Sequence, residues 1–128
     1  MAKFDLPLGG PSQVVSPYAG ASQAARGNAT APTTGTAIAT LSGLPAGWYE
    51  LRVKPGYGGT PDVIDNMQVK IGSAVLSQLI VQAVANGAPV DHVFPRVYVD
   101  GSDITVVPVA NGGVGTIFRA HITATPVA

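Results

Sequence analysis

The chain has 128 residues, no cysteine, and seven basic against seven acidic side chains, so its formal net charge is zero. The absence of cysteine excludes disulfide frameworks, thiolate metal sites and cysteine nucleophiles. Only 11% of the residues are charged while 46% are hydrophobic. A free-standing soluble protein usually carries more charge, so this composition favours a protein whose surface is partly covered in an assembly.

The distribution of charge and hydropathy excludes two kinds of partner. The basic residues are scattered along the sequence, whereas binding to phosphates requires clustered lysine and arginine side chains; we therefore expect no nucleic-acid partner. Residues 1–7 lack the apolar run of a signal peptide, and no segment approaches the roughly 18 apolar residues of a membrane span. The sequence thus predicts a soluble protein with no membrane partner and no cleaved export signal.

Residues 1–35 show no hydrophobic period and are interpreted as an extended N-terminal arm. Pro11, Pro17 and Pro32 interrupt any helix, and glycines supply flexible joints. A segment so poor in apolar residues is usually ordered by lying on a neighbour. The few apolar side chains that are candidates for this protein-binding contact are Phe4, Leu6, Leu8, Val14, Val15 and Tyr18.

Residues 36–128 are predicted to form a β-sandwich domain, because the hydrophobic period there is two. In residues 48–54, Tyr49, Leu51 and Val53 share one face of a strand while charged residues occupy the other. Residues 66–71 repeat the pattern, and Gly72-Ser73 makes a two-residue turn into residues 74–79. This segment is the clearest predicted hairpin.

Further strands are predicted at residues 36–41, 81–85, 93–99, 104–109 and 115–123. Seven or eight short strands without a long helical period indicate an all-β, two-sheet antiparallel sandwich. A jelly roll is the preferred topology, and an immunoglobulin-like sandwich is the alternative. Pro55, Pro95 and Pro108 are expected at edges, bulges or strand ends, because proline cannot donate to a ladder.

Catalytic residue types are scarce, and we expect no catalytic site and no cofactor. His92 and His121 are the only histidines, Glu50 is the only glutamate, and no known catalytic or nucleotide-binding motif occurs. The segments 62–65 and 100–103 each hold two aspartates, but neither has the alternating oxygen ligands of a calcium loop. We therefore expect no metal, and interpret Asp100-Gly101 as a hairpin turn.

Three aromatic residues are candidate loop contacts. Residues 55–61 are glycine-rich but lack the lysine and the following helix of a phosphate cradle. Tyr57 in this loop, with Trp48 and Tyr98, supplies rings that would stack on a sugar. A tryptophan at a strand start is more often part of a core or an interface.

Four short segments carry a resemblance to a known family, at residues 44–53, 65–70, 85–90 and 109–112. Through them the chain resembles the small β-sandwich proteins encoded among the head genes of tailed bacteriophages. Some of those are capsid decoration, or cement, proteins. The resemblance covers about residues 36–126 and rests on turns and strands. The arm departs from a minimal sandwich.

The resemblance implies a non-enzymatic virion structural protein, assembled in the host cytoplasm, that stabilises the capsomer lattice from the outer capsid surface. Its implied partners are the major capsid protein and copies of itself in a homodimer or homotrimer. One alternative is a phage tail, spike or fibre component that binds a host glycan through Tyr57, Trp48 or Tyr98. Another is a hydrolase built from Asp91, His92 and Asp103.

Overall fold

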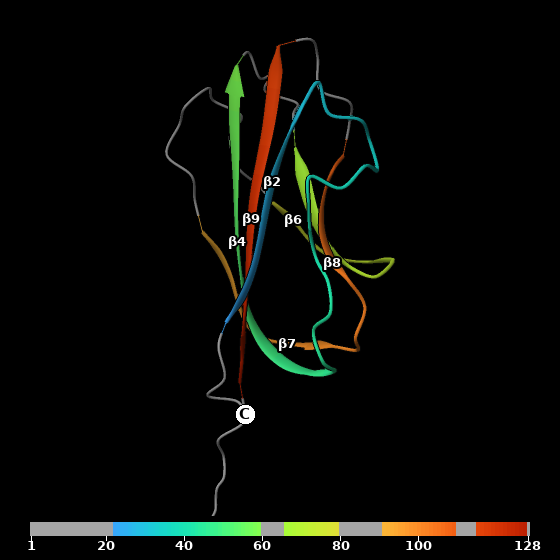
Figure 1. Cartoon of the computed structure of the whole chain (residues 1–128), viewed down its shortest axis with the longest axis vertical. Helices are drawn as coiled ribbons and strands as arrows, with labels where there is room; N and C mark the ends of the chain where they lie inside the picture. The colour runs from blue at the N-terminus through green and yellow to red at the C-terminus, as the bar shows by residue number, and fades with distance from the viewer. Residues whose placement is uncertain (1–21, 60–65, 80–90, 110–114, 128) are drawn as a thin grey trace, which may run out of the picture.

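The computed structural model describes residues 22–59, 66–79, 91–109 and 115–127, and their regular structure is entirely β-strand (Figure 1). The first sheet holds, in spatial order, β2 (Gln23–Thr30), β9 (Thr116–Pro126), β4 (Gly47–Gly59) and β7 (His92–Val99). The second holds β3 (Ala39–Leu41), β8 (Ile104–Pro108), β5 (Met67–Ile71) and β6 (Ala74–Leu79). No helix in these ranges is long and apolar enough to cross a membrane.

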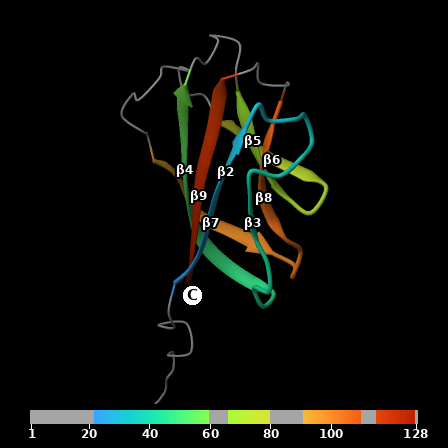
Figure 2. The same cartoon turned by 45° about the horizontal axis from the view of Figure 1, so that its top comes forward.

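The two antiparallel sheets confirm the predicted all-β sandwich. Each consecutive pair of strands lies in different sheets, except β5 and β6, which are neighbours in the second sheet. Figure 2 shows β4, β9 and β2 side by side, with β5, β6 and β8 to their right. This order is compatible with the predicted jelly roll, whose chain also alternates between two four-stranded sheets.

The core lies between the sheets and is built around the pairing of β4 with β9. These strands pair over eleven residues, from Tyr49 opposite Pro126 to Gly59 opposite Thr116. Their inward side chains are apolar, and Leu51, Val53, Phe118 and Ile122 are each 0% exposed. Burial of each such side chain stabilises the fold by about 1.5–3 kcal/mol. The alternation predicted for residues 48–54 is thus confirmed, and β9 alternates in the same way.

The predicted hairpin and the predicted positions of the prolines also agree with the structure. Ile71 pairs with Ala74 across the two-residue turn, where Gly72 takes a φ of 60° that glycine adopts without strain. Pro108 ends β8, and Pro95 lies in the edge strand β7 beside a register shift. Pro55 lies within β4, beyond the part of that strand that pairs with β7.

Three sequence interpretations are wrong. Residues 23–30, assigned to the arm, form β2, which pairs with β9 along its whole length; the sandwich therefore begins before residue 36. Residues 55–59, assigned to a glycine-rich loop, continue β4. Residues 100–103 do not close a hairpin, because β7 and β8 belong to different sheets. The strand predicted at 36–41 is limited to Ala39–Leu41, and the one predicted at 81–85 lies outside the described residues.

The place of β2 in the sandwich gives a stability test at Gly27. A Cβ atom there would lie 2.2 Å from the backbone oxygen of Ile38, so Gly27→Ala must push β2 away from the chain that leads into β3. We expect a loss of about 1–3 kcal/mol in the free energy of unfolding, measured by urea denaturation. Gly47→Ala is the matched control, because its Cβ would meet no atom within 4 Å. Equal stability of the two variants would contradict the close contact.

Candidate functional site

The outer face of the first sheet gathers most of the basic side chains. Six lysines and arginines fall in the described ranges, and the five on this face are Arg26, Arg52, Lys54, Arg96 and Arg119. Residues directly opposite one another in paired strands point to the same side of a sheet. Strand register therefore brings together cations that are scattered in the sequence, a convergence that the sequence analysis missed.

An exposed aromatic cluster, defined as Trp48, Tyr98 and Arg96, lies at the β4–β7 side of this face. Trp48 pairs with Tyr98 across the two strands, and their rings meet edge to face with centroids 5.3 Å apart. The Arg96 guanidinium lies 4.5 Å from the centre of the Trp48 ring, within the range of a cation–π interaction. Trp48 nevertheless remains 43% exposed and Tyr98 51% exposed.

The backbone beneath the aromatic cluster is held by hydrogen bonds. The Tyr49 hydroxyl donates to the carbonyl oxygen of Pro45 at 2.5 Å, and the amide of Val127 donates to the carbonyl oxygen of Trp48 at 3.0 Å. Tyr49 itself is buried in the core. Two hydrogen bonds, one to Pro45 and one from Val127, therefore restrain the start of β4, which carries Trp48.

The predicted loop contacts are only partly brought together. Trp48 and Tyr98 meet, but on strands and not on loops. Tyr57 is 4% exposed and packs its ring edge to face against Phe118, with centroids 5.0 Å apart. It is a core residue and is not available to stack on a sugar. The six candidate arm contacts, Phe4, Leu6, Leu8, Val14, Val15 and Tyr18, lie outside the described residues.

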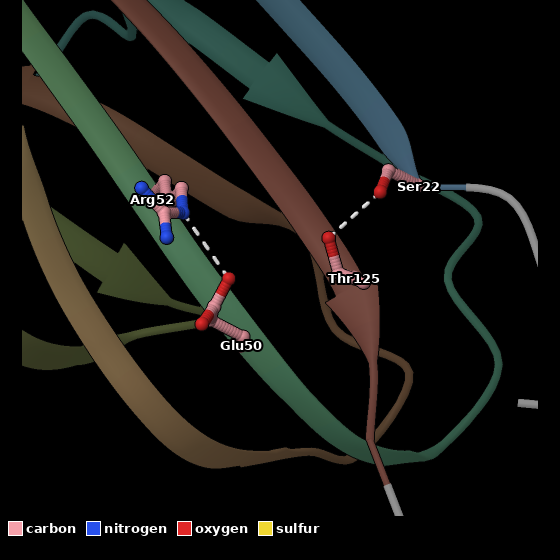
Figure 3. Close-up of polar contacts among 4 residues, drawn as sticks. All are labelled: Ser22, Glu50, Arg52 and Thr125. Atoms are coloured by element: carbon pink, nitrogen blue, oxygen red, sulfur yellow. Dashed lines mark hydrogen bonds and ion pairs between the residues drawn. The ribbon is translucent and has the colours of Figure 1, made fainter. Parts of the chain in front are cut away.

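The chain enters the sandwich at the same end of the first sheet as the aromatic cluster. The hydroxyl oxygens of Ser22 and Thr125 are 2.7 Å apart (Figure 3), and Gln23 pairs with Ala124 near the end of β9. That end of β9 lies beside the start of β4, where Tyr49 pairs with Pro126. On the same face, Arg52 donates a hydrogen bond to Glu50 at 3.1 Å, and Figure 3 also shows this pair.

The residues proposed for a hydrolase are not brought together. His92 begins β7 and Asp103 follows its end, so the length of an eight-residue strand separates them. The Asp91 carboxylate lies 3.7 Å from the Lys54 ammonium, and the buried His92 Nε2 has no hydrogen-bond partner in the part of the chain that the structure describes. Among the described residues no three histidine or acidic side chains gather where they could hold a metal; Asp62 and Asp65 lie outside those ranges.

Asp100 stabilises the chain where it crosses from β7 to β8. Its carboxylate accepts a hydrogen bond from the backbone amide of Ser102 at 3.0 Å, and Gly101 between them has a φ of 97°. The side-chain hydrogen bond from Ser102, and then its backbone amide, lower the pKa of Asp100 below the ordinary 3.8. This arrangement is an Asx turn, and it serves the crossing of the chain between sheets.

Comparison with known proteins does not identify a relative. No model of a known protein family matches the chain, and no curated protein is significantly similar to it.

The Asx turn gives a prediction for the pH dependence of Asp100. Its pKa is lowered in the folded chain, so the ionised carboxylate favours folding above the unfolded value of 3.8 and this contribution is lost as pH falls through the folded pKa. Ser102→Ala removes the side-chain hydrogen bond but keeps the backbone one. The pKa should therefore rise toward 3.8 without reaching it, as followed by carboxyl ¹³C NMR. An unchanged pKa in this variant would show that the hydroxyl has no such role.

Proposed function

We propose that the protein is a non-enzymatic virion structural protein that binds the outer surface of a phage capsid and stabilises its capsomer lattice. The observation that carries this proposal is the aromatic cluster on the outer face of a β-sandwich. Trp48 and Tyr98 are 43% and 51% exposed, so folding leaves about half of each ring's apolar surface in water, where a partner would bury it. The resemblance to phage decoration proteins supplies the capsid as the partner.

The composition of the aromatic cluster supports a protein partner. Tryptophan, tyrosine and arginine are enriched among the few interface residues whose truncation weakens a protein–protein complex by about 2 kcal/mol or more. The edge-to-face contact and the Arg96 guanidinium fix the position of the Trp48 ring before any partner arrives. Less side-chain entropy is then lost on binding.

The place where the chain enters the sandwich supports a joint contact by arm and cluster. Ser22 and Gln23, where the described chain begins, lie beside the end of β9, and β9 lies next to β4, which carries Trp48. Neighbouring strands are about 4.8 Å apart, so the start of β2 lies about two strand spacings from the start of β4. We propose that the arm and the aromatic cluster hold the same partner surface.

The proposed role does not require one strong site. Identical copies on a symmetric shell act together, so many moderate contacts reinforce the lattice through multivalency. The low charge of the chain, 11% of residues, supports a molecule that is partly covered in such an assembly. We further propose the jelly roll as the topology, which the alternation of the chain between the sheets supports.

A second candidate function is recognition of a host glycan by a tail or spike component. The exposure of Tyr98 favours it, because sugars stack on open aromatic faces. Two observations argue against it: Tyr57 is buried in the core, and the Arg96 guanidinium covers the face of the Trp48 ring on which a sugar would stack. Binding of the isolated protein to a glycan array, lost in Tyr98→Ala, would favour this function over the first.

The copy number in the purified source virion tests the proposed location. Quantitative mass spectrometry against the major capsid protein should give an abundance comparable with that of the capsid subunits. A handful of copies would place the protein at the tail or at a vertex, and its absence from the particle would overturn the structural role.

The aromatic cluster is tested by binding to particles that lack the protein. Trp48→Ala should weaken binding by at least about 10-fold, since it removes a contact of the hot-spot kind. Val75→Ala is the control, because Val75 is a 53% exposed hydrophobic residue of β6 in the other sheet. Thermal unfolding checks that both variants are folded. Equal binding by the two variants would exclude the cluster from the contact.

A further inference from the structure

A second feature of the outer face is a groove with basic walls, across β2, β9 and β4. It is an open depression of about 400 Å³, and its charged and polar lining residues are Arg26, Asn28, Lys54, Arg119 and His121. Trp48 and Tyr98 do not line it. Lys54 is six residues from Trp48 along β4, about 20 Å at the rise of an extended strand. We call this depression the basic groove.

Strand register places His121 and two of the cations in one row. His121 on β9 is directly opposite Arg26 on β2 and directly opposite Lys54 on β4. Adjacent strands lie about 4.8 Å apart, so the backbones of the three residues fall within about 10 Å. Arg119 is two residues from His121 on the same face of β9. The groove therefore concentrates positive charge.

Interactions within the folded chain compensate little for the repulsion between these cations. Arg119 lies diagonally across from both Arg26 and Lys54 on the neighbouring strands, and charges of the same sign at this separation repel one another. The carboxylate of Asp91 is 3.7 Å from the Lys54 ammonium, but the two side chains are 46% and 41% exposed, and exposed pairs of this kind contribute little. Within the described ranges, neither Arg26 nor Arg119 makes an ion pair with a carboxylate. An anion bound between them would offset the repulsion.

Gly58 of β4 makes room for the Arg119 side chain. A Cβ atom there would lie 2.7 Å from Nη1 of Arg119 and 3.0 Å from Nη2, whereas one at Gly56 would make only an ordinary contact, 3.8 Å from the Arg119 Cβ. The guanidinium therefore lies across β4 in space that any other residue at position 58 would fill. Tyr57 thus places a ring in the core, and Gly58 next to it leaves space for a guanidinium on the outer face.

We propose that the basic groove binds a compact oxyanion that carries at least two negative charges, of the phosphate or carboxylate kind. Two guanidinium groups suit this chemistry, because their planar donors match the oxygen pairs of both groups. The volume lies within the range of small-molecule sites. Three basic side chains and one histidine are too few for the many phosphate contacts of a nucleic acid. The inference stands independently of the proposed capsid role.

Isothermal titration calorimetry of the full chain at low ionic strength tests the proposal. Two probes are used: pyrophosphate tests for a phosphate ligand, and citrate tests for a carboxylate ligand. We expect a Kd below about 1 mM for at least one probe, with weakening as salt is added. Binding of pyrophosphate alone identifies a phosphate site, and binding of citrate alone identifies a carboxylate site.

Variants locate the binding in the groove. Arg119→Gln and Lys54→Gln should each weaken it by at least about 10-fold, because each removes a charged donor. Arg52→Gln is the matched control, since Arg52 lies on the same face of β4 and outside the groove, bound to Glu50 at 3.1 Å. Gly58→Ala should also weaken binding, because its Cβ displaces the flexible end of Arg119, and it should leave thermal stability nearly unchanged.

Several results would overturn the proposal. One is that neither probe binds below about 1 mM; another is binding that Arg119→Gln and Lys54→Gln leave unchanged. A single-stranded oligonucleotide that binds more tightly than both probes, and loses affinity in the same variants, would replace the compact anion by a nucleic acid. These experiments measure anion binding, whereas the Trp48→Ala experiment measures binding to particles. The failure of one proposal is therefore distinguishable from the failure of the other.

Discussion

The pairing of β4 with β9 sets both the interior and the exterior of this molecule. Along eleven paired residues, every second side chain enters the core and the others form the outer face. The register that places Leu51 opposite Ala124 inside also places Lys54 opposite His121 outside. A shift of one residue would expose the apolar set and bury the cations. Burial of the apolar side chains therefore fixes the geometry of the groove and of the aromatic cluster.

Much of the fold was predictable because it follows a local pattern. The alternation in β4 and β9 and the Gly72-Ser73 turn are contained in short windows of sequence. β2 was missed because its inward residues are small: Ala25 and Ala29 are only half-buried, and Gly27 has no side chain. Without an apolar period, nothing in residues 23–30 distinguishes a strand from a polar arm. Its pairing with β9 depends on residues about a hundred positions away.

The candidate site was less predictable, because it depends on which strands are neighbours. Trp48 and Tyr98 were both singled out, but their contact requires β4 to lie beside β7. The cations looked scattered because Arg26, Lys54 and Arg119 are far apart in the chain and meet only through register. Tyr57 was assigned to a loop since glycines and prolines surround it. In the fold those residues lie where β4 has lost β7 as a neighbour, and the strand tolerates them there.

The gathering of cations on one face has an electrostatic consequence for the whole molecule. Arg26, Arg52, Lys54, Arg96 and Arg119 share that face with the acidic residues Glu50 and Asp91, which leaves three positive charges. Elsewhere in the described residues the charged side chains are Lys70, Asp100 and Asp103, which sum to one negative charge. The described part of the molecule therefore has an asymmetric distribution of charge. A negatively charged surface attracts the cationic face more strongly than the rest, so its field favours one orientation of approach.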